Sequence, residues 1–203
     1  VALLWSSGGL LIKLISWNPI AIAGFRSAVA ALFILLIIKK PRITWSFPQV
    51  GGAIAYALTV ISFVTATKLT TAANAILLQY SAPIYVAVFG AWFLKEKAKL
   101  LDWIIIFFVI SGMFLFFLDE LSMDNLYGNL LAVFSGLCFA ALAIFMRKQK
   151  YGSPLESAFL GNIVTAIIGL PFMFNTEKPD LTGWCMLLVL GIFQLGLSYI
   201  LYS

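Results

Sequence analysis

The chain has 203 residues, of which 63% are hydrophobic and 10% are charged; its net charge is +5, and it contains no histidine. A soluble protein of this size needs more polar surface than that, so we expect an integral membrane protein that binds no nucleic acid. The missing histidine removes histidine-based metal sites, Ser-His-Asp triads and imidazole proton relays. We therefore expect no enzyme activity, no metal and no cofactor.

Eight apolar segments follow one another along the chain, separated by charged residues, prolines or asparagines. Most approach the length of about 20 residues that a transmembrane helix needs. The connections are short, so nearly the whole protein is expected to lie in the bilayer. The predicted spans are Ala2–Ile15, Pro19–Ile38, Phe47–Ala66, Thr71–Leu94, Leu101–Leu118, Tyr127–Met146, Leu155–Phe174 and Leu181–Tyr202.

Basic residues gather in alternate loops. The loops between spans two and three, four and five, and six and seven carry Lys39, Lys40, Arg42, Lys95, Lys97, Lys99, Arg147, Lys148 and Lys150. Short cytoplasmic loops are rich in Lys and Arg. The pattern predicts a multi-pass protein of the cytoplasmic membrane, with these loops and the N-terminus in the cytoplasm.

A weak internal repeat appears at an offset near 136 residues. Ser62 corresponds to Ser198 (198 − 62 = 136), and Pro19 corresponds to Pro154 within a residue. A unit with an odd number of spans inverts the copy that follows it, as in many secondary transporters. We therefore expect a second unit whose last two helices lie beyond Ser203.

The two expected units set the fold class. Residues 1–120 would form the first five-helix repeat, and residues 125–203 the second repeat, truncated after its third helix. The predicted fold is an all-α integral membrane protein with inverted five-helix repeats. About eight of its ten helices would lie in this chain.

The fourth span carries polar residues and a proline inside an apolar run. Helical spacing places Asn74, Ser81 and Tyr85 on one face, and Gln79 and Pro83 on nearly the opposite one. We expect the first face to line a cavity and the second to pack against other helices. The alternative is that both amides only bond between helices.

Spans three and eight also present small or polar side chains at helical steps. Hydroxyls and amides of this kind can bind a polar solute of either charge, although close helix packing is an alternative for span three. The candidate cavity residues from these two spans are Tyr56, Thr59, Ser62, Gln194, Ser198 and Tyr202.

Arg26 is a charge inside the second span, about 10 Å along the helix from Pro19. An intramembrane charge costs at least a few kcal/mol, so we count Arg26 as a candidate solute-binding residue, with snorkelling to the headgroups as the alternative. Asn162 occupies the repeat-related position.

No carboxylate lies mid-span, since Asp102 and Glu156 are at the inner ends of their spans. This weakens a mechanism in which transport is coupled to protons through a carboxylate.

Three stretches resemble the EamA-type family of the drug/metabolite transporter superfamily. They are AANAILLQYSAPIYVAVFGAWFLKEK in span four, LLWSSGGLLIK followed by PIAIAGFRSAVAALFILLI at the start, and Tyr127 to Lys148. Arg26 falls at that family's typical arginine.

The resemblance implies ten helices in two inverted repeats and cytoplasmic termini. It also implies a central cavity lined largely by spans three, four, eight and nine. The implied function is a secondary transporter that exports small metabolites, amino acids or drug-like solutes by alternating access. The alternative is a non-transporting membrane component, such as a receptor or an assembly partner.

Overall fold

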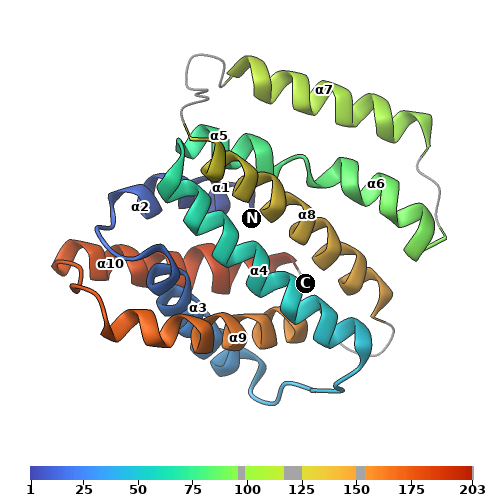
Figure 1. Cartoon of the computed structure of the whole chain (residues 1–203). Coiled ribbons are helices and arrows are strands. Elements are labelled where there is room, and N and C mark those ends of the chain that lie inside the picture. The colour runs from blue at the N-terminus through green and yellow to red at the C-terminus, as the bar shows by residue number, and fades with distance from the viewer. Residues whose placement is uncertain (96–98, 117–124, 150–153, 203) are drawn as a thin grey trace.

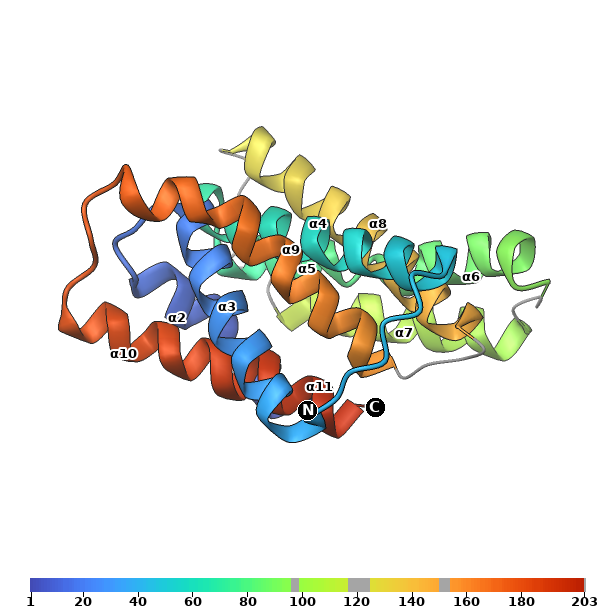
Figure 2. The ribbon, with the colours of Figure 1, turned by 90° about the horizontal axis from the view of Figure 1, so that it is seen from below.

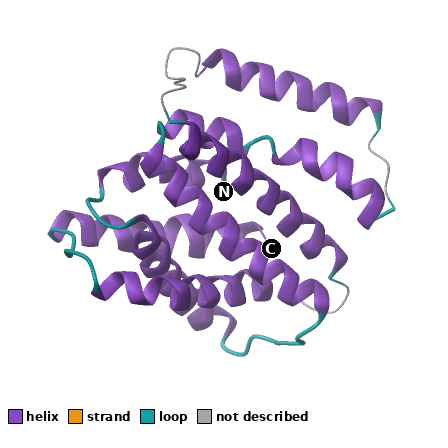
Figure 3. Ribbon diagram, viewed as in Figure 1, coloured by secondary structure: helices purple, strands orange, loops and turns teal. Residues whose placement is uncertain are grey.

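A computed structural model describes residues 1–95, 99–116, 125–149 and 154–202. All regular secondary structure among these residues is helical, and loops join the helices (Figure 3). The elements are α1 (Ala2–Ser6), α2 (Gly8–Leu14), α3 (Pro19–Ile38), α4 (Phe47–Leu69), α5 (Ala72–Gln79), α6 (Ala82–Phe93), α7 (Leu100–Phe116), α8 (Leu126–Lys148), α9 (Pro154–Phe174), α10 (Leu181–Val189), the π-helix η2 (Leu190–Leu197) and α11 (Ser198–Tyr202).

These elements match the predicted membrane spans. Among the described residues, six helical segments are long and apolar enough to cross a membrane: Pro19–Ile38, Phe47–Leu69, Ala72–Phe93, Leu126–Lys148, Pro154–Phe174 and Leu181–Leu201. Two shorter apolar segments, Leu3–Leu14 and Leu100–Gly112, correspond to predicted spans one and five. The predicted end of span five, residues 117–118, lies outside the described residues. The protein is therefore a multi-pass helical membrane protein.

The fourth span is not the single helix that we predicted. It breaks at Tyr80 and Ser81, between α5 and α6. Pro83 has no N–H to donate to the carbonyl group of Gln79 four residues earlier, so the helical hydrogen bonding is interrupted there. Gly136 of α8 packs against the break, where a Cβ atom would lie 2.8 Å from the Gln79 carbonyl oxygen.

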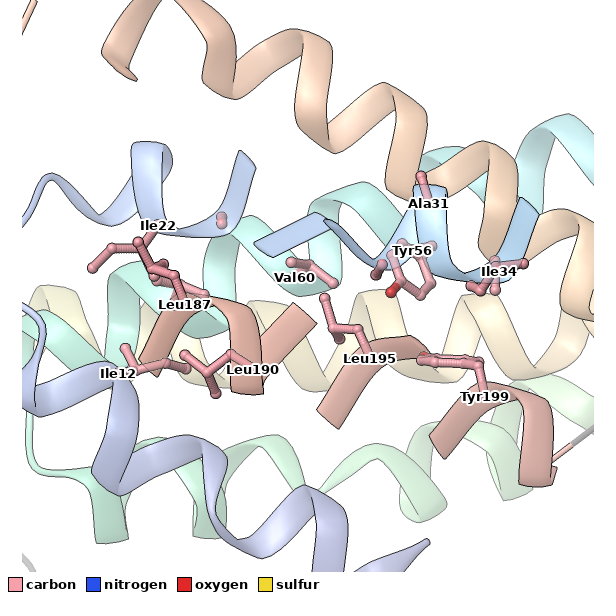
Figure 4. Packing of buried hydrophobic residues seen from close by; sticks show 14 of the residues in the cluster. Ile12, Ile22, Ala31, Ile34, Tyr56, Val60, Leu187, Leu190, Leu195 and Tyr199 are labelled. Atoms are coloured by element: carbon pink, nitrogen blue, oxygen red, sulfur yellow. The ribbon is translucent and has the colours of Figure 1, made fainter. Parts of the chain in front are cut away.

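The helices pack around a core shared by the two halves of the chain. α4 lies along α8 and also contacts α9, while α7 lies at the edge of the molecule against α5 and α6 (Figure 1). The core contains buried side chains from α2, α3, α4, α10 and η2 (Figure 4). Those labelled in the close-up include Ile12, Ile22, Ile34, Val60, Leu187, Leu190 and Leu195.

The backbones of the two halves approach each other closely at the crossing of α3 and α9, which Figure 2 shows from below. Gly24 and Gly169 meet there: a Cβ atom on Gly169 would lie 2.5 Å from the Cα atom of Gly24. A Cβ atom on Gly24 would lie 2.7 Å from the Cα atom of Gly169. Small residues allow this approach in membrane helices, so the two glycines determine how the halves join.

The basic loops lie together in space. The loop between α3 and α4 and the C-terminal ends of α6 and α8 lie at one end of the bundle (Figure 1). The loop between α9 and α10, which carries Glu177 and Asp180, lies at the other end. Lys97 and Lys150 lie outside the described residues. The described basic and acidic loops are thus separated along the bundle, as the sequence pattern predicts.

Replacing Gly169 with valine should destabilise the α3–α9 crossing. The added side chain overlaps the α3 backbone, and overpacking of this kind costs about 1–3 kcal/mol. We expect a matching fall in the free energy of unfolding, measured by SDS titration from mixed micelles. Gly112→Val is the control, because a Cβ atom at Gly112 would meet nothing within 4 Å. Equal losses in the two variants would contradict the proposed importance of the crossing.

Candidate functional site

Arg26 lies inside the bundle. Its side chain is 2% exposed, and its Nη1 donates a hydrogen bond of 2.8 Å to Oε1 of Gln194 in η2. The side chain therefore remains among the helices instead of reaching the headgroups. The bond also joins α3 of the first half to η2 of the second.

A second polar bond joins the halves close by. The hydroxyl of Tyr56 on α4 donates to Oδ1 of Asn162 on α9 at 3.1 Å, and both side chains are fully buried. Asn162 lies at the position related to Arg26 by the repeat offset (162 − 26 = 136). In each half, the second span therefore bonds to the third span of the other half.

Aromatic rings close the space beside these bonds. The ring of Tyr199 lies 5.2 Å from that of Tyr56 and 5.9 Å from that of Trp5, between centroids. Trp5 also lies 6.2 Å from Phe139 of α8 and donates from Nε1 to Oγ of Ser198 at 2.8 Å. Figure 4 shows Tyr56 and Tyr199 near Leu195. We define the central cluster as Trp5, Arg26, Tyr56, Asn162, Gln194, Ser198 and Tyr199.

The π-helix sets the position of Gln194. Such segments are rare and are frequent at functional sites, because the wider turn redirects side chains. The Gln194 carbonyl accepts a hydrogen bond from Oγ of Ser198. Its side chain lies directly over Gly8, where a Cβ atom would come within 1.7 Å of Nε2. Gln194 is thus held between the backbone of α2 and the guanidinium of Arg26.

Four of the ten residues predicted to line a cavity meet in the central cluster: Arg26, Tyr56, Gln194 and Ser198. The other members were not among our candidates. Asn162 could have been found as the repeat mate of Arg26, and Tyr199 as the neighbour of Ser198. Nothing in the sequence singles out Trp5, because it lies in an apolar helix.

Asn74 lies away from the central cluster, at the contact between α5 and α8. Its Nδ2 donates to Oδ1 of Asn129 at 3.0 Å and to Oγ1 of Thr70 at 3.1 Å. Gln79 also bonds to α8, through Oγ of Ser135 at 2.9 Å. Both amides therefore bond between helices, as the alternative in the sequence analysis has it.

Thr59 and Ser81 use their hydroxyls on backbone carbonyls of their own spans. Thr59 donates to Ala55 at 2.7 Å, and Ser81 donates to Leu78 at 2.6 Å beside the break in the span. These bonds satisfy polar groups locally.

The remaining candidates lie in three different settings. Ser62 is buried on α4, and Tyr85 is half-buried on α6. The side chain of Tyr202 lies outside the described part of the chain.

A separate cleft of about 280 Å³ between α6, α8 and the start of α9 is lined by Val86, Leu94, Ala143, Ile144, Met146, Arg147 and Pro154. It contains none of the central cluster.

Comparison with known proteins identifies the family. The sequence model of the EamA-like transporter family matches residues 1–118 and 126–203. The chain belongs to the EamA-like transporter family. The all-helical fold and the resemblance that we noted in the sequence agree with this assignment.

Three similar proteins are named as an exporter, a solute carrier or a transporter. The pseudopaline exporter CntI of Pseudomonas aeruginosa is 26% identical over 182 residues, which cover 84% of this chain and 63% of that protein. Solute carrier family 35 member G1 of Mus musculus is 28% identical, covering 84% of this chain and 50% of that protein. The uncharacterized transporter YxxF of Bacillus subtilis is 27% identical, covering 66% and 45%. The chain thus spans about half to two thirds of their lengths.

A solved crystal structure shares the fold of this EamA-like chain. It superposes with a TM-score of 0.73 over 97% of this chain and 73% of the other, at 16% sequence identity. At that identity the match supports the arrangement of helices and nothing about the solute.

A double-mutant cycle on Tyr56→Phe and Asn162→Leu should reveal coupling between α4 and α9. Hydrogen bonds between membrane helices contribute about 0.5–1.5 kcal/mol, so we expect a coupling energy in that range in SDS unfolding. Tyr56→Phe combined with Gln79→Leu is the control and should be additive, because Gln79 bonds to α8 instead. Additivity in both pairs would show that the Tyr56–Asn162 bond does not stabilise the protein.

Proposed function

We propose that the protein is a secondary transporter that exports a small metabolite through the central cluster by alternating access. The observation that carries the proposal is that polar side chains of both halves bond to one another at the centre of the bundle. Transporters with inverted repeats bind their solutes at such a repeat interface, near the middle of the membrane. The exporter and transporter names of the relatives support the same activity and the outward direction.

The hydrogen bonds at the centre are weak enough for a polar solute to replace one of their partners. A hydrogen bond between membrane helices is worth about 0.6 kcal/mol on average, and a bond to a charged group such as Arg26 about 1.5–3 kcal/mol. A polar solute can therefore replace the Gln194 amide or the Asn162 amide without a large barrier. Alternating access needs two states separated by no more than a few kcal/mol, which bonds of this strength permit.

The proposal includes the topology predicted from the sequence. Residues 1–120 and 125–203 are two inverted repeats, and the basic loops and the N-terminus face the cytoplasm. The grouping of the described basic loops at one end of the bundle supports this orientation. The partners are the small-molecule solute and the lipid bilayer.

Transport should depend on the central cluster and not on polar bonds elsewhere. The purified protein in proteoliposomes is tested by counterflow with a panel of radiolabelled amino acids and small organic acids and amides. For a solute that wild type moves, Gln194→Ala should slow uptake at least tenfold, because the amide at the centre is lost. Gln79→Ala removes an amide that bonds to α8 and should retain most of the uptake. The reverse pattern would place the pathway at α5.

Solute should also change the accessibility of the cluster. We expect Ser198→Cys, in a background with Cys138 and Cys185 replaced by serine, to react with a membrane-impermeant maleimide at a rate that transported solute changes severalfold. Ser198 is buried beside Trp5, so it becomes reactive only when the bundle opens. Asn74→Cys is the comparison position. A rate at Ser198→Cys that no transported solute alters would contradict the proposed pathway.

A further inference from the structure

The guanidinium of Arg26 is a buried positive charge with neutral neighbours. It bonds to the Gln194 amide, and the phenol groups of Tyr56 and Tyr199 lie close enough to interact with it electrostatically. A charge inside the membrane is costly unless an opposite charge or strong hydrogen bonds compensate it. Amide and phenol dipoles compensate it only in part.

The two described carboxylates of α9 and of the α10 N-cap lie toward the ends of their helices. Glu156 is six residues from Asn162 of the central cluster (162 − 156 = 6), about 9 Å along α9. It is 13 residues from Gly169 (169 − 156 = 13), which packs against Gly24 beside Arg26, and this is about 20 Å. Asp180 is 14 residues from Gln194 (194 − 180 = 14), again about 20 Å.

Both carboxylates already serve local structure. Glu156 accepts the backbone N–H of Arg42 at 2.8 Å, which ties the loop between α3 and α4 to α9. Asp180 caps α10 by accepting the backbone N–H of Gly183 at 2.9 Å. They therefore hold the two ends of the bundle, away from the mid-span level of Arg26.

The guanidinium also retains donor capacity. Its Nε is fully buried and finds no hydrogen-bond acceptor among the described atoms. A guanidinium presents its N–H groups as a planar fork that matches a carboxylate with two parallel bonds. Gln194 supplies one neutral oxygen atom where a carboxylate would supply two charged ones.

We propose that Arg26 binds the carboxylate of an amphipathic organic anion, and that Oε1 of Gln194 occupies this position when no solute is bound. The inference rests on the proposed transport function and specifies its solute class. The rings of Trp5, Tyr56, Phe139 and Tyr199 lie around the same centre and provide an apolar surface for the body of the solute. The buried positive charge disfavours cationic solutes.

Gln194 is placed to leave when the anion arrives. It lies in the π-helix, whose wider turns accommodate rearrangement more readily than a regular α-helix. Only the absence of a side chain at Gly8 leaves room for it beside α2. The hydrogen bond from Arg26 to the Gln194 amide compensates the positive charge between transport events. The solute carboxylate then replaces the Gln194 amide and forms an ion pair with the guanidinium.

The test is equilibrium binding of a matched pair of probes, 3-phenylpropanoate and its neutral amide 3-phenylpropanamide, to the purified protein in detergent. The two differ only in the group that would meet Arg26. For wild type we expect the carboxylate to bind about ten- to a hundredfold more tightly than the amide, as a charged hydrogen-bonded pair provides. Equal binding, or tighter binding of the amide, would overturn the inference.

Two variants assign the preference to Arg26. Arg26→Gln should remove it, and Gln194→Glu should also remove it, because a fixed carboxylate 2.8 Å from the guanidinium occupies the site. Gln194→Glu keeps the test decisive if Arg26→Gln does not fold. Gln79→Glu is the matched control and should retain the preference, since Gln79 bonds to α8. A preference that survives in a folded Arg26→Gln or Gln194→Glu variant would contradict the inference.

The binding and transport measurements together distinguish a failure of this inference from a failure of the proposed function. If wild-type proteoliposomes move a neutral solute but the probes bind alike, the transporter proposal stands and the anion site fails. If the carboxylate binds through Arg26 but no panel member is moved, the anion site stands and the transporter proposal fails.

Discussion

Two hydrogen bonds between the halves, from Arg26 to Gln194 and from Tyr56 to Asn162, pair polar side chains at the centre of the bundle. Hydrocarbon offers no partner for such groups, so the helices that carry them must stay together. The glycine contact of α3 and α9 brings the halves close enough for these bonds to form. The helices therefore pack at the centre so that these polar groups have partners, and in the proposed function a solute would replace one of these partners.

The two halves are related but not equal. Where one half places Arg26, the other places Asn162, so the pair of bonds contains a single formal charge. α4 is a regular helix, whereas the corresponding third span of the second half contains the π-helix around Gln194. The charge of the first half and the irregular backbone of the second half therefore meet at one hydrogen bond, from Arg26 to Gln194. Under the proposed function, a solute at the centre would meet one positively charged side chain, that of Arg26.

Much of the fold could be predicted from the sequence, because apolar length defines a membrane span, although the break of the fourth span between α5 and α6 was not predicted. The site was only partly predictable. Helical spacing tells which face a residue occupies but not which helix covers that face, so the sequence could not show that Asn74 bonds to Asn129 of α8. Whether Arg26 points to lipid or protein likewise depends on its neighbours. The repeat offset, applied to Arg26, points to Asn162, which we had not counted as a candidate.

The central claim is that solute binds where these two bonds meet. The most direct measurement is an electron cryo-microscopy structure of the protein with a solute that it transports. We predict density between α3, α4, α9 and η2, in contact with Arg26, and with the Arg26–Gln194 bond broken. Density between α5 and α8 beside Asn74, with both central bonds intact, would contradict the account.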